Sequence, residues 1–335
     1  GKAAPVATTP PIQREKKISD EKGFGPYKPV HKGTGHGLTE FQQRHLDELV
    51  ARYTARTERS KKLTAEHRPH LADPRTVSGF RSVWKELVYP IVTERSAGSK
   101  LWDVDGNEYI DLTNGFGAIL FGHGPDFVKA AIQEQLGRGM EIGPQSPLAG
   151  EVAKLLCELT GMERAAFCNT GSEAVLAALR MARTVTGRDK IAMFAGDYHG
   201  IFDEVVARAA GGAKSRPAAP GIPPIMTDNV IVLEYDDPAS LDTLRAHAGE
   251  LAAIIVEPVQ SRRLDLQPKE FLTELRDLST QSGAALIFDE IVTGFRSHLG
   301  GAQALFGVRA DIATYGKVIG GGLSLGVVAG KTECK

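Results

Sequence analysis

The feature that most constrains the fold is a regular alternation of apolar runs and amphipathic segments after residue 165. The runs are short and rich in β-branched residues, which predicts buried strands, and the segments between them have apolar residues at helical spacing. We expect strands at 165–168, 191–195, 230–233, 252–256 and 284–288, and helices at 173–185, 239–249 and 269–282. This alternation predicts an α/β fold with a mainly parallel sheet and helices on both faces. Ligands of such sheets bind beyond the carboxyl ends of the strands.

The first 82 residues are predicted to precede the main body. Residues 1–37 open with Ala, Pro and Thr and lack apolar periodicity, which is typical of a linker or a disordered tail. An amphipathic helix is predicted from Thr39 to about residue 63, because Thr39 and Gln42 have capping-box spacing and an apolar stripe follows. We therefore interpret 38–82 as a helical lead-in whose helix docks on the main body.

The next part of the sequence predicts a hairpin and two helices. Residues 100–112 alternate in polarity around Asp105-Gly106, a pair that favours a tight hairpin turn. We interpret 83–125 as the N-terminal part of a smaller α+β domain and 126–335 as a large domain, with helices at 126–136 and 148–159. The chain begins at Gly1 and stops soon after the strand-like run 325–329, so we expect a piece of a longer polypeptide that lacks its C-terminal part.

Composition narrows the class of protein. Of 335 residues, 42% are hydrophobic and 24% charged, which is typical of a globular protein with a sizeable core. A net charge of −1 gives no field that would attract nucleic acid or an anionic membrane. No apolar run approaches the ~20 residues that span a bilayer, and the start lacks an export signal. Three cysteines without metal-like spacing favour a cytoplasmic protein that binds no metal.

A phosphate-binding loop is predicted at 169–172 (Asn-Thr-Gly-Ser), between a strand and the helix that starts near Glu173. The N-terminus of a helix presents unpaired N–H groups and a partial positive charge, which suit a phosphate. Gly171 allows close approach of the backbone, and Ser172 adds a hydroxyl. An alternative interpretation is that this segment only supplies a helix N-cap.

Three further residues follow predicted strands. Tyr198 has an aromatic ring that can stack on a flat ligand, and His199 can orient that ligand. The alternative is a surface turn with a packed tyrosine. Glu257 ends the next strand, where its carboxylate is expected to face the crevice or to be solvated before Pro258.

Asp289 and Lys317 complete the pattern. Asp289 ends a predicted buried strand, so its carboxylate needs a partner: a pyridinium N–H, a helix N-terminus or Arg296. Lys317 lies in a Gly-rich loop, where it is either an exposed lysine or a nucleophile whose pKa burial has lowered. A phosphate loop, a stacking tyrosine, an acidic partner and a lysine at successive strand ends are what pyridoxal phosphate chemistry needs.

The same residues carry a resemblance to a known family. The stretches are 169–174 (Asn-Thr-Gly-Ser-Glu-Ala), 198–200 (Tyr-His-Gly), 256–259 (Val-Glu-Pro-Val), 288–296 (Phe-Asp-Glu-Ile-Val-Thr-Gly-Phe-Arg) and 316–322 (Gly-Lys-Val-Ile-Gly-Gly-Gly). Together they resemble class III aminotransferases, the fold-type I enzymes that include glutamate-1-semialdehyde 2,1-aminomutase, from about residue 88 onward.

The resemblance implies a cofactor and roles for these residues. It implies a mainly parallel, seven-stranded-type sheet, and pyridoxal 5′-phosphate held covalently by Lys317, the catalytic residue. It also implies a contact from Asp289 to the pyridine nitrogen and packing of Tyr198 and Ile291 on opposite ring faces. Gly171 and Ser172 would bind the phosphate. The substrates would be an amino-acid donor and a keto acceptor, and the assembly a homodimer with active sites at the interface.

Other stretches are more specifically similar to aminotransferase domains embedded in polyketide and nonribosomal peptide synthetases. These are 24–29 (Phe-Gly-Pro-Tyr-Lys-Pro), 71–76 (Leu-Ala-Asp-Pro-Arg-Thr) and 111–117 (Asp-Leu-Thr-Asn-Gly-Phe-Gly). That resemblance implies amination of an acyl chain bound to an acyl carrier protein, with Asn114 and Phe116 near the substrate mouth. The aminomutase has Ser-Trp where Gly115-Phe116 stands, which argues against glutamate-1-semialdehyde as substrate.

Three functions therefore remain open from the sequence. The first is transamination within a biosynthetic megasynthase, in which Lys317 acts as general base and acid. The second is intramolecular amino transfer by an enzyme of the aminomutase type. The third is a truncated domain with a structural or dimerisation role.

Overall fold

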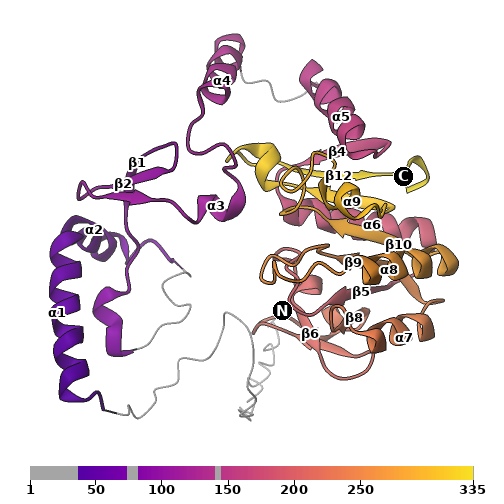
Figure 1. Ribbon diagram of the computed structural model, residues 1–335, viewed down its shortest axis with the longest axis horizontal. Coiled ribbons are helices and arrows are strands. Elements are labelled where there is room, and N and C mark those ends of the chain that lie inside the picture. Colours follow the sequence, from indigo (N-terminus) through magenta and orange to yellow (C-terminus); the bar gives the residue numbers. More distant parts are fainter. Residues whose placement is uncertain (1–36, 74–81, 140–144, 335) are drawn as a thin grey trace, which may run out of the picture.

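The computed structural model describes residues 37–73, 82–139 and 145–334 (Figure 1). Residues 1–36 of the predicted linker 1–37, which include the stretch 24–29, lie outside these ranges, as does part of 71–76. Every helix in the described ranges is too short or too polar to span a lipid bilayer.

A seven-stranded sheet forms the centre of the molecule, in the order β4-β12-β11-β10-β9-β5-β8. The five strands from β11 to β8 run parallel, whereas β12 is antiparallel to both of its neighbours, β4 and β11. The strands span Arg164–Cys168 (β4), Lys190–Phe194 (β5), Val230–Leu233 (β8), Leu251–Val256 (β9), Ala285–Asp289 (β10), Ile312–Tyr315 (β11) and Gly326–Gly330 (β12). This arrangement confirms the predicted α/β fold with a mainly parallel sheet.

Helices cover both faces of the sheet, as the apolar runs predict. Successive strand residues alternate between two cores: Ile254 packs in one, and Ile255 in the other. One core includes Leu179 of α6 (Gly171–Thr186). The other core is closed by α5 (Pro147–Thr160), α7 (Pro238–Ala246), α8 (Lys269–Ser282) and α9 (Gly301–Phe306). Strands β8 to β12 are therefore buried along their whole length, whereas the edge strand β4 is partly exposed.

The N-terminal part forms a separate layer beside the sheet domain (Figure 1). It contains α1 (Glu40–Arg56), α2 (Glu58–His67) and a three-stranded antiparallel sheet of β1 (Thr93–Ala97), β2 (Lys100–Asp103) and β3 (Glu108–Ile110). The predicted capping box at Thr39 and Gln42 is present. The hairpin predicted around Asp105-Gly106 corresponds to β2 and β3.

One expectation for the lead-in helix was wrong. The helix is interrupted at Thr57, whose backbone leaves the helical region and whose hydroxyl bonds to the hydroxyl of Tyr89. The helix packs on the chain that follows it: α1 contacts the 3-10 helix η2 (Ser82–Leu87), although none of its residues is buried. An amphipathic stripe specifies that a helix has an apolar side, but not which neighbour receives it.

The remaining elements connect the parts described so far. They are α3 (Asn114–Gly117), α4 (Asp126–Arg138), the hairpin of β6 (Ala207–Ala209) and β7 (Ser215–Pro217), and the 3-10 turns η3 (Asp203–Val205), η4 (Pro224–Thr227), η5 (Lys317–Gly320) and η6 (Thr332–Cys334). Strands β1, β6, β7 and β11 and helix α9 were not predicted.

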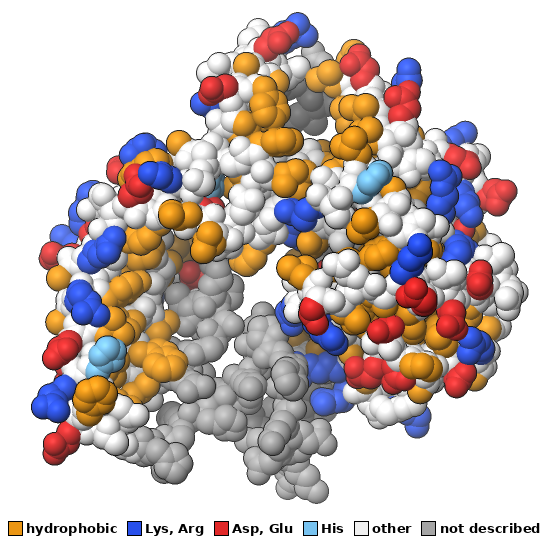
Figure 2. Space-filling model, viewed as in Figure 1, with side chains coloured by type: hydrophobic (Ala, Val, Ile, Leu, Met, Phe, Trp, Pro, Cys, Tyr) orange, Lys and Arg blue, Asp and Glu red, His pale blue; other side chains and the backbone are white. Residues whose placement is uncertain are grey.

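Helices α4 and α5 carry uncovered apolar side chains. Phe127 and Leu136 on α4, and Leu148 and Leu155 on α5, are exposed. Figure 2 shows hydrophobic side chains gathered on both helices. The described chain thus leaves an apolar surface open beside the sheet.

Candidate active site

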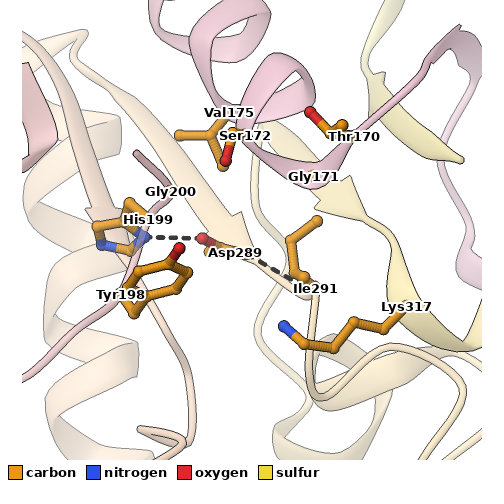
Figure 3. Close-up of a pocket in the computed structure, with 10 residues that line it drawn as sticks. All are labelled: Thr170, Gly171, Ser172, Val175, Tyr198, His199, Gly200, Asp289, Ile291 and Lys317. Carbon is orange, nitrogen blue, oxygen red and sulfur yellow. Dashed lines mark hydrogen bonds and ion pairs between the residues drawn. The ribbon is translucent and has the colours of Figure 1, made fainter. Parts of the chain in front are cut away.

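A pocket lies at the carboxyl ends of the parallel strands, where the sheet architecture predicts a ligand (Figure 3). Its cavity measures about 170 Å³. The lining residues are Thr170, Gly171, Ser172, Val175, Tyr198, His199, Gly200, Asp289, Ile291 and Lys317. All seven residues predicted to bind the cofactor, including the lysine, therefore meet at one place.

The loop before α6 forms one wall of the pocket. Thr170 is the N-cap, and its hydroxyl accepts from the N–H of Glu173, whose side chain accepts in return from the N–H of Thr170. This leaves the N–H groups of Gly171 and Ser172 in the first turn, where the helix provides no backbone acceptor. Since Thr170 supplies the cap, the Ser172 hydroxyl is not needed for it and lines the pocket. The wall has the features of an anion site.

Close packing fixes this loop. A Cβ on Gly326 of β12 would lie 2.1 Å from the carbonyl oxygen of Thr170, so β12 approaches the loop as only glycine permits. A Cβ on Gly171 would lie 2.7 Å from Cδ1 of Ile291. The loop is therefore held between the strand and the side chain of Ile291.

Asp289 lies at the base of the pocket and is 2% exposed. Its Oδ2 is 2.7 Å from Nδ1 of His199, and its Oδ1 accepts hydrogen bonds from the N–H of Ile291 and the hydroxyl of Thr314. Of the partners considered from the sequence, Arg296 is not used: its guanidinium donates to the carbonyl oxygens of Val292 and Gly117. His199 is a partner that sequence reasoning missed, because the two residues are far apart in the chain.

The electrostatics of the pocket floor are unusual. Burial lowers the pKa of His199, but contacts with Asp197 and Asp289 outweigh it and raise that pKa to about 10. Burial, together with the charges of Asp197 and Asp289, raises the pKa of Glu257 to about 7. His199 is thus a cation at neutral pH, whereas the carboxyl group of Glu257 is partly protonated there.

Lys317 follows β11 and points into the pocket from the side opposite Tyr198 and His199 (Figure 3). Its backbone has a φ of 45°, in the left-handed region, which is costly for a lysine and typical of residues held for function. Burial lowers the pKa of its amine, although the charges of Asp289 and Glu257 act in the opposite direction. In the described ranges no hydrogen bond or ion pair fixes the amine. Lys317 therefore has the features of a nucleophile.

Tyr198 and Ile291 lie on different sides of the cavity (Figure 3). Tyr198 is 51% exposed, so its ring is available to a ligand and is not packed into the core. Its backbone N–H donates to Oε2 of Glu257 at 3.0 Å. The segment is therefore not a surface turn with a packed tyrosine. Its tyrosine ring is exposed, and its backbone is hydrogen-bonded to the end of the neighbouring strand.

Three predicted crevice residues do not line the cavity. Glu257 is buried behind Tyr198, so it is neither solvated nor facing the crevice directly. Asn114 and Phe116 lie on α3, which contacts η5 beside Lys317, and Phe116 is 77% exposed. The positive φ of both residues keeps the turn tight. Thr170, Val175 and Gly200 line the pocket without having been assigned to it from the sequence.

Comparisons with known proteins agree with this geometry. Residues 82–335 match the family described as aminotransferase class-III. Glutamate-1-semialdehyde 2,1-aminomutase of Aquifex aeolicus is 41% identical over 249 residues, covering 73% of this chain and 59% of the relative. The corresponding protein of Chloroflexus aurantiacus is 44% identical, again over 73% of this chain but 56% of the relative.

Solved structures show the same fold. A transaminase with PLP bound is 35% identical with a TM-score of 0.75, covering 83% of this chain and 65% of that one. An aminomutase structure from Pseudomonas aeruginosa PAO1 is 25% identical, also with a TM-score of 0.75, and covers 89% and 66% of the two chains. The chain thus spans less than two thirds of the length of these proteins.

Proposed function

Since this chain belongs to the class III aminotransferases, a family that depends on pyridoxal 5′-phosphate, we propose that it forms the cofactor-binding part of an enzyme that transfers amino groups. The observation that carries the proposal is the pocket itself. It combines the first N–H groups of a helix, a buried carboxylate and a lysine amine whose pKa burial lowers.

The pocket residues fit the cofactor group by group. The N–H groups of Gly171 and Ser172, with the Ser172 hydroxyl, would hold the phosphate at the start of α6. Asp289 would accept a hydrogen bond from the pyridine nitrogen, and Tyr198 and Ile291 would enclose the ring. Lys317 would bind the aldehyde through its amine.

When bound, the cofactor supplies an aldehyde that accepts the amino group and a ring that takes up electron density. Lys317 Nζ would take a proton from the substrate carbon and return it at a neighbouring position, as general base and then acid. Burial favours this role, because a lowered pKa increases the neutral fraction of the amine at neutral pH. Asp289, held by His199 and Thr314, stays in place while charge develops.

The substrate class has two candidates, each with support. Transfer between an amino-acid donor and a keto acceptor is supported by the transaminase structures. Intramolecular transfer is supported by the names of the curated relatives. A carrier-bound acyl acceptor rests on the stretches 24–29, 71–76 and 111–117 alone.

A homodimer is part of the proposal. The exposed apolar side chains of α4 and α5 support it, because a surface of this kind needs a cover in water.

The proposal is tested by trapping the lysine. The protein is incubated with pyridoxal phosphate, reduced with borohydride and digested, and the modified residue is located by mass spectrometry. We expect the adduct on Lys317, and none at that position in Lys317→Ala. Lys269→Ala, which removes an exposed lysine, is the matched control and should behave like the wild type. Modification spread over exposed lysines, with Lys317 unmodified, would contradict the proposal.

A further inference from the structure

The floor of the pocket contains a second aspartate with no part in the proposed reaction. Asp197 follows β5, and its side chain is completely buried. Its Oδ2 lies 3.2 Å from Nε2 of His199, the ring nitrogen that faces away from Asp289. His199 is itself completely buried, so each of its ring nitrogens faces a carboxylate.

The two contacts of His199 differ in kind. The Nδ1–Asp289 contact of 2.7 Å is a hydrogen bond. The Nε2 contact is an ion pair without hydrogen-bond alignment, since Nε2 has no hydrogen-bond partner among the described residues. A neutral imidazole would leave one nitrogen as an acceptor against a carboxylate, which is repulsive. Two flanking carboxylates therefore favour the doubly protonated ring.

Asp197 is fixed independently of His199. Its Oδ1 accepts from Nε2 of Gln260 at 2.6 Å, and its Oδ2 accepts from the N–H of Glu257 at 3.1 Å. Gln260 also donates to the carbonyl oxygen of Ala195, so the amide joins the ends of two neighbouring strands. Burial raises the pKa of Asp197 above its ordinary value, although the contacts with His199, Gln260 and the N–H of Glu257 act in the opposite direction. The carboxylate is thus held at one position by the sheet.

We propose that Asp197 is a positioning residue of the cofactor pocket, which holds His199 as a buried cation and so leaves the charge of Asp289 to the cofactor. The proposal rests on the proposed function, because it assigns Asp289 to the pyridine nitrogen. With Asp197 present, two carboxylates face two cations: the imidazolium of His199 and the protonated pyridine nitrogen of the bound cofactor. Without Asp197, Asp289 alone would have to compensate both, at a high cost in a buried site.

The other titratable groups near His199 do not replace Asp197. Glu257 packs from the end of β9, and its pKa of about 7 leaves it partly neutral at neutral pH. Tyr235, after β8, has a pKa that burial raises, so it carries no charge. Lys317 approaches from β11 with an amine whose pKa is lowered. Asp197 and Asp289 are therefore the two carboxylates that contact the ring.

The test uses Asp197→Asn, which keeps the size of the side chain and removes its charge. Asp228→Asn, which makes the same change at an exposed position, is the matched control. The cofactor-free proteins are labelled with ¹⁵N-histidine, and the ring nitrogens are titrated by NMR from pH 5 to pH 10; His199→Gln assigns the signal. In the wild type and Asp228→Asn we expect His199 to stay doubly protonated through pH 8. In Asp197→Asn the midpoint should fall by about one pH unit or more.

A second readout is the affinity for pyridoxal phosphate. We expect the Kd to rise about tenfold in Asp197→Asn and to stay within about twofold in Asp228→Asn. An unchanged Kd would overturn the positioning role. An unchanged His199 midpoint would overturn the charge argument on which that role depends. Should Asp197→Asn not fold, a wild-type His199 that titrates near its ordinary value would still overturn the proposal.

The titration is independent of the proposed function, because it needs no cofactor. If the His199 midpoint is the same in Asp197→Asn as in the wild type and the Lys317 adduct forms, only the role of Asp197 is refuted. If the His199 titrations are as expected but no adduct forms on Lys317, the proposed function is refuted.

Discussion

Gly200 and Ser172 lie so close together that a Cβ on Gly200 would be 2.6 Å from the Ser172 hydroxyl oxygen and 2.9 Å from its Cβ. Gly200 also has a φ of 114°, which L-residues rarely adopt. The glycine of the Tyr-His-Gly stretch thus makes room for the serine of the phosphate loop. Two segments that are separate in the sequence share one wall of the pocket.

Gly200→Ala should therefore damage the phosphate site. The new methyl group has to displace Ser172, and the backbone is strained as well, so we expect about 1–3 kcal/mol less free energy of unfolding. The Kd for pyridoxal phosphate should rise about tenfold or more, since the loop moves. Fluorescence titration and urea unfolding measure the two effects. Gly249→Ala has open space around the added Cβ and is the control; equal behaviour of both variants would refute the argument.

Glu257 should make stability depend on pH near neutrality. Its pKa of about 7 lies above the unfolded value, so its contribution is fully present below about pH 4.5 and is lost as the pH rises through 7. The neutral isostere Glu257→Gln lacks this loss. We expect the difference in free energy of unfolding, variant minus wild type, to become more positive by up to about 3 kcal/mol between pH 5 and pH 8. Urea unfolding over that range measures it, and a flat difference would show that Glu257 is ionised throughout.

Replacing one carboxylate oxygen of Glu290 should destabilise the protein. Burial raises its pKa, while its oxygens accept from the Thr293 hydroxyl and from the N–H groups of Ala302 and Gln303. Glu290→Gln turns an NH₂ group towards one of these donors. We therefore expect the free energy of unfolding, measured with urea, to fall by about 2–4 kcal/mol. The exposed Glu270→Gln is the control. A change below about 0.5 kcal/mol would mean that the segment rearranges freely.

Phe116 should affect substrate use but not the cofactor. The side chain is exposed and does not line the pocket, although α3 contacts η5, the turn that begins at Lys317. For Phe116→Ala we expect an unchanged Kd for pyridoxal phosphate and a stability within about 0.5 kcal/mol of the wild type. In a preparation that shows amino transfer, KM for the acceptor should rise severalfold with little change in kcat. Phe41→Ala, on α1, should leave KM unaltered, and a KM that does not differ between the two variants would remove Phe116 from the substrate mouth.

The sequence was most informative where local pattern and burial coincide. The runs that became β8, β9 and β10 are buried along their whole length, so each was visible as an apolar stretch. Strand β11 was hidden because its four residues precede a Gly-rich loop. The prediction of one continuous lead-in helix failed for another reason: Thr57, where the helix breaks, bonds to Tyr89, a partner far along the chain that no local pattern names.

For the pocket, the order of residue types along the chain was enough to bring seven of them together. Their partners could not be read in the same way. The contact of Asp289 with His199 depends on the order β11-β10-β9-β5 in the sheet, which places the two strand ends near each other. Asp197 carried no signal of its own beyond its place before Tyr198.

The pairing of β4 with β12 has a consequence for the order in which the pocket folds. The phosphate loop emerges from β4, an edge strand whose neighbour in the sheet is β12. During synthesis the loop would leave the ribosome long before residues 326–330 exist, and until then its strand lacks a hydrogen-bonding neighbour. Closing so long a stretch of chain is entropically slow. We therefore expect the cofactor pocket to mature late in folding, once a short strand that contributes no side chain to the pocket lining has paired with β4.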